Sequence, residues 1–120
     1  MEIDIIKNFN YLNLNILKIC KKINRNPLEI NIVAVSKGQD QEKLKGLLKI
    51  KHNSFGENRL QEATHKWNNF KNEYVDLHYI GALQSKKAQG IYEIFDVIET
   101  LDSDSSAEKI AKCIIGKVKQ

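Results

Sequence analysis

Residues 30–37 constrain the fold of this chain more than any other segment. The run from Ile30 to Ser36 is mostly apolar and rich in β-branched residues, and it ends abruptly at Lys37. Such a run is typical of a buried strand in a parallel sheet. The lysine then lies at the carboxyl end of that strand, where α/β folds place their functional residues.

Strand-like and helix-like segments alternate along the rest of the chain. Strands are expected near residues 30–36, 52–56, 77–80 and 95–101. Helices are expected near residues 41–51, 57–70 and 84–93, with a last helix opening at a capping box at 105–108. This order predicts an α/β fold of about four parallel β-α units, preceded by an N-terminal helix.

The length limits how large this α/β structure can be. A (β/α)8 barrel takes about 250 residues, whereas this chain has 120, of which 42% are hydrophobic and 28% charged. One domain over residues 1–120, or half of a larger domain, is all that fits. Periodicity alone does not choose between a small open sheet and half of a barrel.

An apolar stripe runs along the first predicted helix. Its members recur at alternating steps of four and three residues: Ile5, Phe9, Leu12, Ile16, Ile19 and Ile23. The stripe spans less than three heptads, which favours a helix packed on a domain over a coiled coil. We therefore expect the stripe to be buried.

Composition argues against several classes of protein. The formal net charge is +4, but the lysines are spread among carboxylates, so nucleic-acid binding is not indicated. Cys20 and Cys113 are far apart and fit no metal-ligand spacing, which favours two reduced core cysteines. No stretch approaches the ~20 apolar residues of a membrane span, and the N-terminus lacks the pattern of a signal peptide. These features predict a cytoplasmic protein without a metal site.

Lys37 is the first candidate for chemistry. Because side chains alternate along a strand, Val33, Val35 and Lys37 share one face. If that face is interior, burial lowers the pKa of the lysine, and the neutral amine can attack an aldehyde to form a Schiff base. Spacing alone leaves open the alternative that the lysine simply leaves the sheet for water.

Two further segments carry candidate site residues. Gly56 stands at a strand-to-helix junction, where exposed helix amides favour an anion; alternatively, the segment is a tight turn with Glu57 at the positive end of a helix. His78 and Ile80 share a strand face. Either the imidazole of His78 points toward the same site as Lys37, or it is a core histidine whose polar groups are satisfied by a neighbour.

Three segments together resemble one family. VAVSK at 33–37, FGENRLQEA at 55–63 and HYIGALQSKK at 78–87 resemble, in order and spacing, the YggS/PROSC family of pyridoxal-phosphate-binding proteins. The family is similar in fold to the N-terminal domain of bacterial alanine racemase, a TIM barrel. By that resemblance the chain is the N-terminal half of a TIM (β/α)8 barrel and Lys37 is the Schiff-base lysine. The resemblance also places Val35, Asn58, His78 and Ile80 around the cofactor.

The chain departs from the family pattern in several places. It has Gly38, Gln39 and Asp40 after the lysine, and Ala82 and Lys86 stand where the family often has histidine and asparagine. The larger departure is length, because barrels generally bind phosphate with the loops after strands seven and eight. The cofactor's phosphate site is therefore expected to be missing from this truncated member.

The resemblance implies a function with alternatives. It implies a protein of intracellular pyridoxal 5'-phosphate homeostasis, a carrier or regulator and not an enzyme, that has no catalytic residues. One alternative is a truncated or split-gene remnant that acts only as an interaction module without binding the cofactor. The other is a fragment of a racemase-like enzyme, which would need a second base from another domain. Exposed sheet edges predict a second chain carrying the C-terminal half barrel, or self-association.

Overall fold

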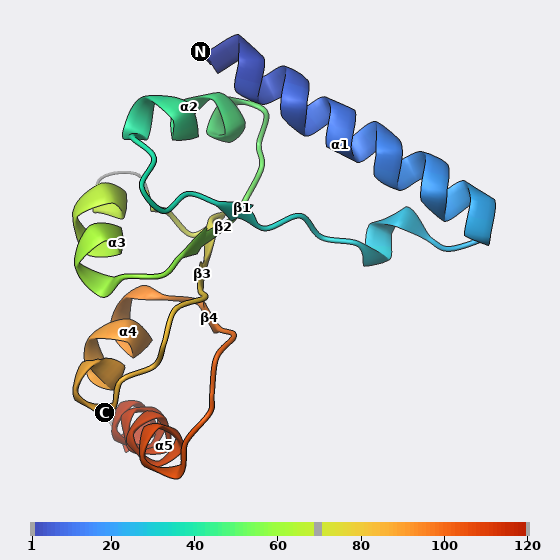
Figure 1. Ribbon diagram of the computed structural model, residues 1–120. Coiled ribbons are helices and arrows are strands. Elements are labelled where there is room, and N and C mark those ends of the chain that lie inside the picture. Colours follow the sequence, from blue (N-terminus) through green and yellow to red (C-terminus); the bar gives the residue numbers. More distant parts are fainter. Residues whose placement is uncertain (1, 69–70, 120) are drawn as a thin grey trace.

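The computed structural model describes residues 2–68 and 71–119 and consists of helices around one parallel sheet (Figure 1). The helices are α1 (Glu2–Ile23), α2 (Gln41–Lys49), α3 (Leu60–Trp67), α4 (Ala88–Ile94) and α5 (Asp104–Lys119), with 3-10 turns η1 (Pro27–Glu29) and η2 (Ser85–Lys87). The strands are β1 (Ala34–Val35), β2 (Ser54–Glu57), β3 (Asp76–Tyr79) and β4 (Val97–Ile98). All strand pairs are parallel, in the order β1-β2-β3-β4. The predicted α/β fold of four parallel units after an N-terminal helix is confirmed.

Several boundaries differ from the predicted ones. β2 extends to Glu57, so α3 begins at Leu60, and the expected helix end at Phe70 lies outside the described residues. The edge strands β1 and β4 have only two residues each. The capping box predicted at 105–108 is wrong, because α5 begins two residues earlier and the Oγ of Ser103 accepts a hydrogen bond from the Ser106 amide at 3.2 Å.

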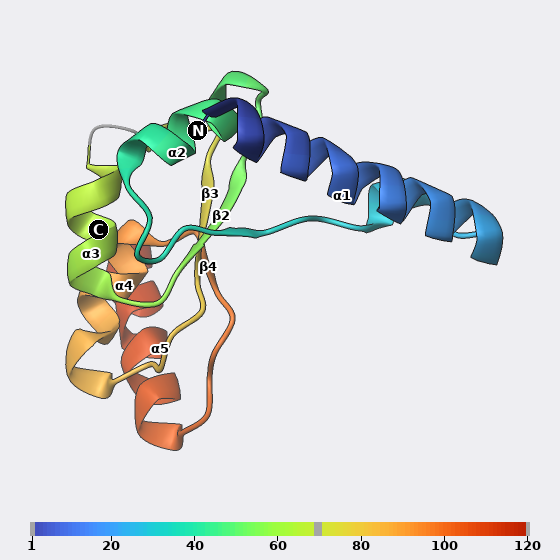
Figure 2. The same cartoon turned by 45° about the horizontal axis from the view of Figure 1, so that its top comes forward.

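One face of the sheet holds the hydrophobic core. Phe55 on β2 and Leu77 on β3 are paired in register and have no exposed surface. Side chains from the covering helices pack onto them, including Ala63 and Trp67 of α3 and Ile91 of α4. Figures 1 and 2 show α2 to α5 on this same side of the strands. The apolar faces of these helices therefore cover the sheet.

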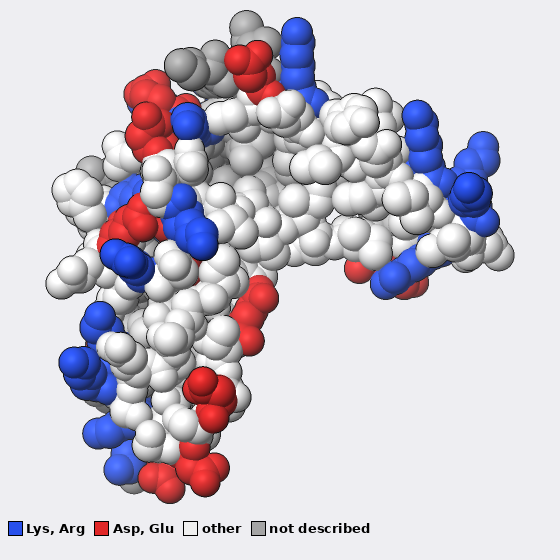
Figure 3. Space-filling view, in the orientation of Figure 1, with Lys and Arg blue, Asp and Glu red and all other residues white. Residues whose placement is uncertain are grey.

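The opposite face of the sheet carries none of the helices α2 to α5. The register places Val35, Gly56, His78 and Val97 in one row across it. Val35 is 50% exposed and Val97 37% exposed. Figure 3 shows a hollow beside these strands that is lined mostly by uncharged residues, with charged side chains over α2 to α5 and along α1. We call this side the uncovered face.

The prediction that the α1 stripe is buried holds only for its first turns. Ile5 and Phe9 pack against the core, whereas Leu12, Ile19 and Ile23 are between 51% and 60% exposed. Figures 1 and 2 show the reason, because α1 runs past the sheet and its second half has no element beside it except the segment around η1. The radius of gyration is accordingly 16.5 Å, against about 14 Å for a compact domain of this length.

The cysteines and the helix lengths bear on two other expectations. Cys20 is buried, Cys113 is half-buried with its thiol 3.1 Å from Oε1 of Gln89, and both are free thiols. The predicted core location is therefore correct for Cys20 and only partly correct for Cys113.

Over residues 2–68 and 71–119, none of the helices combines the length and the apolar character needed to cross a membrane.

His52 contacts α1 and the sheet, and its burial predicts that stability depends on pH. Its ring lies 4.6 Å from Phe9 and 5.3 Å from Phe55, and its Nε2 donates to the carbonyl of Ser54 at 2.8 Å. Burial lowers the pKa of His52 below its ordinary value of 6.5. Below that pH the unfolded chain therefore binds more protons than the folded one.

We expect the free energy of unfolding to rise with pH up to about 6.5 and then level off. Urea titrations across this range measure it. His52→Gln is expected to flatten the slope, and His65→Gln, at an exposed position of α3, is expected to preserve it. An unchanged slope in His52→Gln would assign the pH dependence to other groups.

Candidate functional site

Lys37 lies in a tight turn at the carboxyl end of β1. The amide of Gln39 donates to the carbonyl of Ser36 at 3.1 Å, which closes a four-residue turn with Lys37 at its second position. Gly38, at the third position, has a φ of +70°, as a type II turn requires. The glycine that departs from the family pattern is thus the residue that the turn geometry favours.

The side chain of Lys37 is exposed. The valines before it do not shield it from water as the sequence suggested, since Val35 is itself half exposed. The physical reason is that the short β1 is an edge strand, with a strand neighbour on one side only in the described part of the chain. Val33 and Val35 therefore do not desolvate the Lys37 amine, as the sequence had suggested they would.

Three of the other predicted site residues meet on the uncovered face. A Cβ placed on Gly56 would lie 3.3 Å from Cδ1 of Ile80 and 3.7 Å from Cγ2 of Val35. His78 is in register with Gly56, one strand further across the sheet. The structure therefore brings Val35, His78 and Ile80 together around a glycine at which even a Cβ would be crowded, since it would also lie 3.2 Å from Cγ1 of Val33.

His78 is held by an acidic neighbour. Its Nδ1 lies 2.5 Å from Oε1 of Glu99, a carboxylate that can only accept, so Nδ1 is the donor. The imidazole side chain is 11% exposed and the carboxylate 43% exposed. The histidine is thus held by a neighbour, but by a partly exposed carboxylate on the uncovered face and not by a residue of the core. Glu99 is the residue that sequence reasoning missed.

Asn58 follows β2 directly and touches the loop after β3. A Cβ on Gly81 would lie 2.2 Å from the carbonyl oxygen of Asn58, so only a glycine fits beside that peptide. The hydroxyl of Thr100 donates to the carbonyl of Gly81 at 2.5 Å from the other side. The second and third motifs are thereby locked together at the carboxyl ends of β2 and β3.

A polar cleft of about 540 Å³ opens beside this junction. Its lining includes Arg59 from the second motif and Gln84 and Lys87 from the third. It also includes Tyr79, whose hydroxyl donates to the carbonyl of Ala82 at 2.6 Å and whose pKa is raised by burial. Tyr79 belongs to the helix-covered face, so the cleft is on the outer side of the strands and is distinct from the uncovered face.

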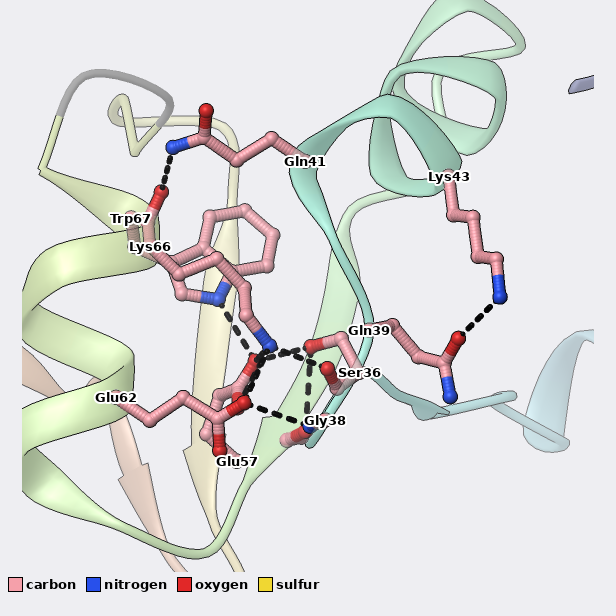
Figure 4. Close-up of polar contacts among 10 residues, drawn as sticks. Ser36, Gly38, Gln39, Gln41, Lys43, Glu57, Glu62, Lys66 and Trp67 are labelled. Carbon is pink, nitrogen blue, oxygen red and sulfur yellow. Dashed lines mark hydrogen bonds and ion pairs between the residues drawn. The ribbon is translucent and has the colours of Figure 1, made fainter.

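A buried polar cluster lies under the lysine-bearing turn, on the helix-covered face (Figure 4). Glu57 has no exposed surface and accepts hydrogen bonds from the hydroxyl of Ser36 at 2.5 Å and from Nε1 of Trp67 at 3.1 Å. The ammonium of Lys66, 7% exposed, pairs with the same carboxylate at 3.0 Å. The alternative that placed Glu57 at the positive end of a helix is wrong, because Glu57 belongs to β2 and points the same way as Phe55.

The cluster reaches the turn through two residues of α3. The ammonium of Lys66 also donates to the carbonyl of Ser36, and Oε2 of Glu62 accepts from the amide of Gly38 at 2.6 Å. The Gly38 amide and, less strongly, Lys66 hold the pKa of Glu62 below its ordinary value. Sequence analysis gave no role to Glu62 or Lys66. The spacing of four between them, typical of a helix ion pair, was the available signal.

The arrangement suits binding of a small molecule at the carboxyl ends of the strands, beside the uncovered face. Among the residues that the structure describes, no group of histidine, cysteine and acidic residues could hold a metal ion. The fold and the site together define an α/β protein equal to about half of a (β/α)8 barrel, with an exposed lysine at the end of its first strand.

Comparison with known proteins agrees with this class. The chain is 33% identical over 105 residues to a pyridoxal phosphate homeostasis protein of Haemophilus influenzae, covering 86% of this chain and 44% of that protein. A relative of the same name from Buchnera aphidicola is 36% identical over 109 residues, covering 91% of this chain and 48% of that protein. The chain is a homologue of the pyridoxal phosphate homeostasis proteins, the YggS family, which confirms the resemblance of its three motifs.

Solved structures give the same result. PipY of Synechococcus elongatus, with pyridoxal phosphate bound, matches with a TM-score of 0.67 and 28% identity over 88% of this chain and 50% of that chain. A protein of unknown function from Bifidobacterium adolescentis matches with a TM-score of 0.85 at 24% identity, over 97% of this chain and 51% of that one, and supports the fold alone. The chain thus spans about half the length of the proteins it matches. No protein-family model matches it.

Proposed function

We propose that the chain contributes to pyridoxal 5'-phosphate homeostasis by holding the cofactor at Lys37. The observation that carries the proposal is the position of Lys37 at the end of β1, beside the row of Val35, Gly56 and His78 on the uncovered face. PipY, a protein of similar fold, has pyridoxal phosphate bound. The cofactor would supply an aldehyde carbon, to which a neutral amine adds with loss of one water molecule.

The described residues fit the flat ring of such a cofactor better than its phosphate. The side chains of Val35 and Ile80 close over Gly56, where an added Cβ would lie 3.3 Å from Cδ1 of Ile80, so this row presents an apolar surface and not a cavity. These apolar groups, with His78 behind them, suit an aromatic ring. We propose that phosphate ligands come from outside these four β-α units, as the loops after strands seven and eight provide in barrels. Affinity for the cofactor is then expected to be lower than that of a complete barrel.

Carrier or regulator activity is proposed in preference to catalysis. The relatives are named as homeostasis proteins, and a racemase would require a second base from another domain. We therefore expect no amino-acid racemisation above background. Racemisation that is lost in Lys37→Arg would instead support the racemase-like alternative.

The uncovered face supports a second part of the proposal, namely that it binds the other half of a barrel. Val35 and Val97 on this face are partly exposed, and β1 and β4 lie at the edges of the sheet. PipY, at twice the matched length, is the argument for four more units as the occupant. They would come from the rest of a longer chain or from a second chain.

The cytoplasm is the proposed location of the protein.

The cofactor proposal is tested by trapping the adduct. Protein is mixed with substoichiometric pyridoxal phosphate, reduced with borohydride and mapped by peptide mass spectrometry. We expect the label at Lys37 and its complete loss in Lys37→Arg, because arginine cannot form the bond. Lys43→Arg, whose lysine bonds to Gln39 beside the turn at 2.7 Å, is the matched control and is expected to label normally. Label that spreads evenly over the lysines would contradict the proposal.

The association proposal is tested by sedimentation and mixing. The chain alone is expected to aggregate or to self-associate weakly. A polypeptide carrying the other half of a relative's barrel is expected to form a 1:1 complex with it. Val35→Lys should weaken that complex, while Leu28→Lys, at a residue that is 91% exposed on η1, should leave it intact. Discrete homodimers without any binding of the second half would favour self-association instead.

A further inference from the structure

We infer that Glu62 and Lys66, supported by Glu57, are positioning residues for Lys37, because they fix the backbone on both sides of it. The inference rests on the proposed function for what the lysine is positioned to do. Its structural basis is separate and lies in the polar contacts of Figure 4, which join the buried cluster to the turn that carries Lys37.

The residue before Lys37 is anchored at three points. The amide of Ser36 donates to the carbonyl of Gly56 at 2.9 Å, its hydroxyl donates to Glu57 at 2.5 Å, and its carbonyl accepts from the ammonium of Lys66. Ser36 is 2% exposed. The peptide that enters Lys37 is therefore tied to the sheet and to α3 at once.

The residue after Lys37 is anchored by a charged acceptor. The amide of Gly38 donates to Oε2 of Glu62 at 2.6 Å. This glycine has nothing within 4 Å of where a Cβ would stand, so packing does not hold it. Its hydrogen bond to the carboxylate is the described contact that restrains it, together with the turn bond from Ser36 to Gln39.

One ammonium joins these two anchors. Nζ of Lys66 lies 3.2 Å from Oε2 of Glu62 and 3.0 Å from Oε2 of Glu57. The carboxylate that holds Gly38 and the ammonium that holds Ser36 are therefore partners in one network. Lys37 is the residue between the two held peptides, so only its side-chain rotamers remain free. A reacting group that is ordered in advance loses less entropy when its bond forms.

The inference is tested by comparing Glu62→Ala, Glu62→Gln and Glu42→Ala. Glu42 pairs with Lys45 three residues later at 3.0 Å and is 78% exposed, so its removal is a matched loss of a helix ion pair away from the turn. The first measurement is hydrogen exchange of the Gly38 amide in cofactor-free protein by NMR. We expect exchange about tenfold faster in Glu62→Ala, since a hydrogen bond to a charged group contributes at least that factor.

The second measurement is the rate at which the borohydride-trapped adduct forms at Lys37 with pyridoxal phosphate. We expect this rate to fall several-fold in Glu62→Ala and to recover in part in Glu62→Gln, whose amide oxygen can still accept from Gly38. Glu42→Ala should change neither measurement. Thermal midpoints of all three variants are measured as a control, to separate these differences from an effect of unfolding.

Each result has a definite consequence. Unchanged Gly38 exchange in Glu62→Ala overturns the inference, because the carboxylate would then not hold the turn. Faster exchange with an unchanged rate of adduct formation also overturns it, because the contact would be structural only. Wild-type protein that forms no adduct at Lys37 overturns the proposed function itself, which distinguishes that failure from the other two.

Discussion

Replacing Lys66 with methionine is expected to lower the free energy of unfolding by about 3–5 kcal/mol, the usual cost of leaving a buried charge without its partner. Glu57 has no exposed surface, and Lys66 is its described cation. Methionine keeps most of the apolar volume of the stem but leaves the carboxylate with only the Ser36 and Trp67 donors. Urea unfolding followed by circular dichroism measures the loss.

Lys45→Met is the control for this prediction. Lys45 pairs with Glu42 on the surface of α2, with 46% and 78% of the two side chains exposed. Exposed pairs contribute about 0–1 kcal/mol, so this variant should unfold almost as the wild type does. Combining Lys66→Met with Glu57→Gln should cost less than the sum of the two single variants, because the groups are coupled. A loss in Lys66→Met no larger than in Lys45→Met would show that the buried pair is not important for stability.

Gly81→Ala is expected to destabilise the protein by about 1–3 kcal/mol or more, the range for inserting an atom into a well-packed site. The new Cβ would lie 2.2 Å from the carbonyl oxygen of Asn58 and 2.9 Å from its carbonyl carbon. Both are backbone atoms, which cannot rotate away as a side chain can. Thr100 holds Gly81 from the other side. We expect the loop after β3 and the segment at Asn58 to separate, with shifted amide NMR signals at both.

Gly90→Ala provides the matched comparison. Its Cβ would lie 2.8 Å from Cδ2 of Leu60, the far end of a flexible side chain. Gly90 is inside α4, where alanine is favoured over glycine by about 1 kcal/mol. A small or favourable change in stability is therefore expected. Equal destabilisation by the two substitutions would mean that crowding against the Asn58 backbone is not the cause of the Gly81 effect.

The sequence predicted the elements well where the signal is local. The strands expected near 52–56 and 77–80 and the helices expected near 41–51 and 84–93 all form, since hydrophobic periodicity depends only on neighbouring residues. The position of Lys37 at a strand end followed from the same pattern. The elements around it were correct in type and order, and their ends were less accurate.

Predictions about burial were less successful, because a residue is buried only where another element of the fold packs against it. The stripe of α1 has the correct period, yet Leu12 and Ile19 are exposed because the helix extends beyond the sheet. One interpretation of the sequence placed Glu57 at the start of a helix, whereas it lies in β2 and is buried. Its position two residues after Phe55 gives it the same face of the sheet as Phe55.

The amino-acid sequence by itself determined the order of the strands and helices, the parallel α/β class and the residue that ends the first strand. Only the tertiary structure decided which charged groups are buried together and what holds the turn around Lys37. Ser36, Glu57 and Lys66 are separated by 9 to 30 residues along the chain. Side-chain periodicity is set by neighbouring residues, whereas the pairing of these groups depends on how α3 packs on β1 and β2.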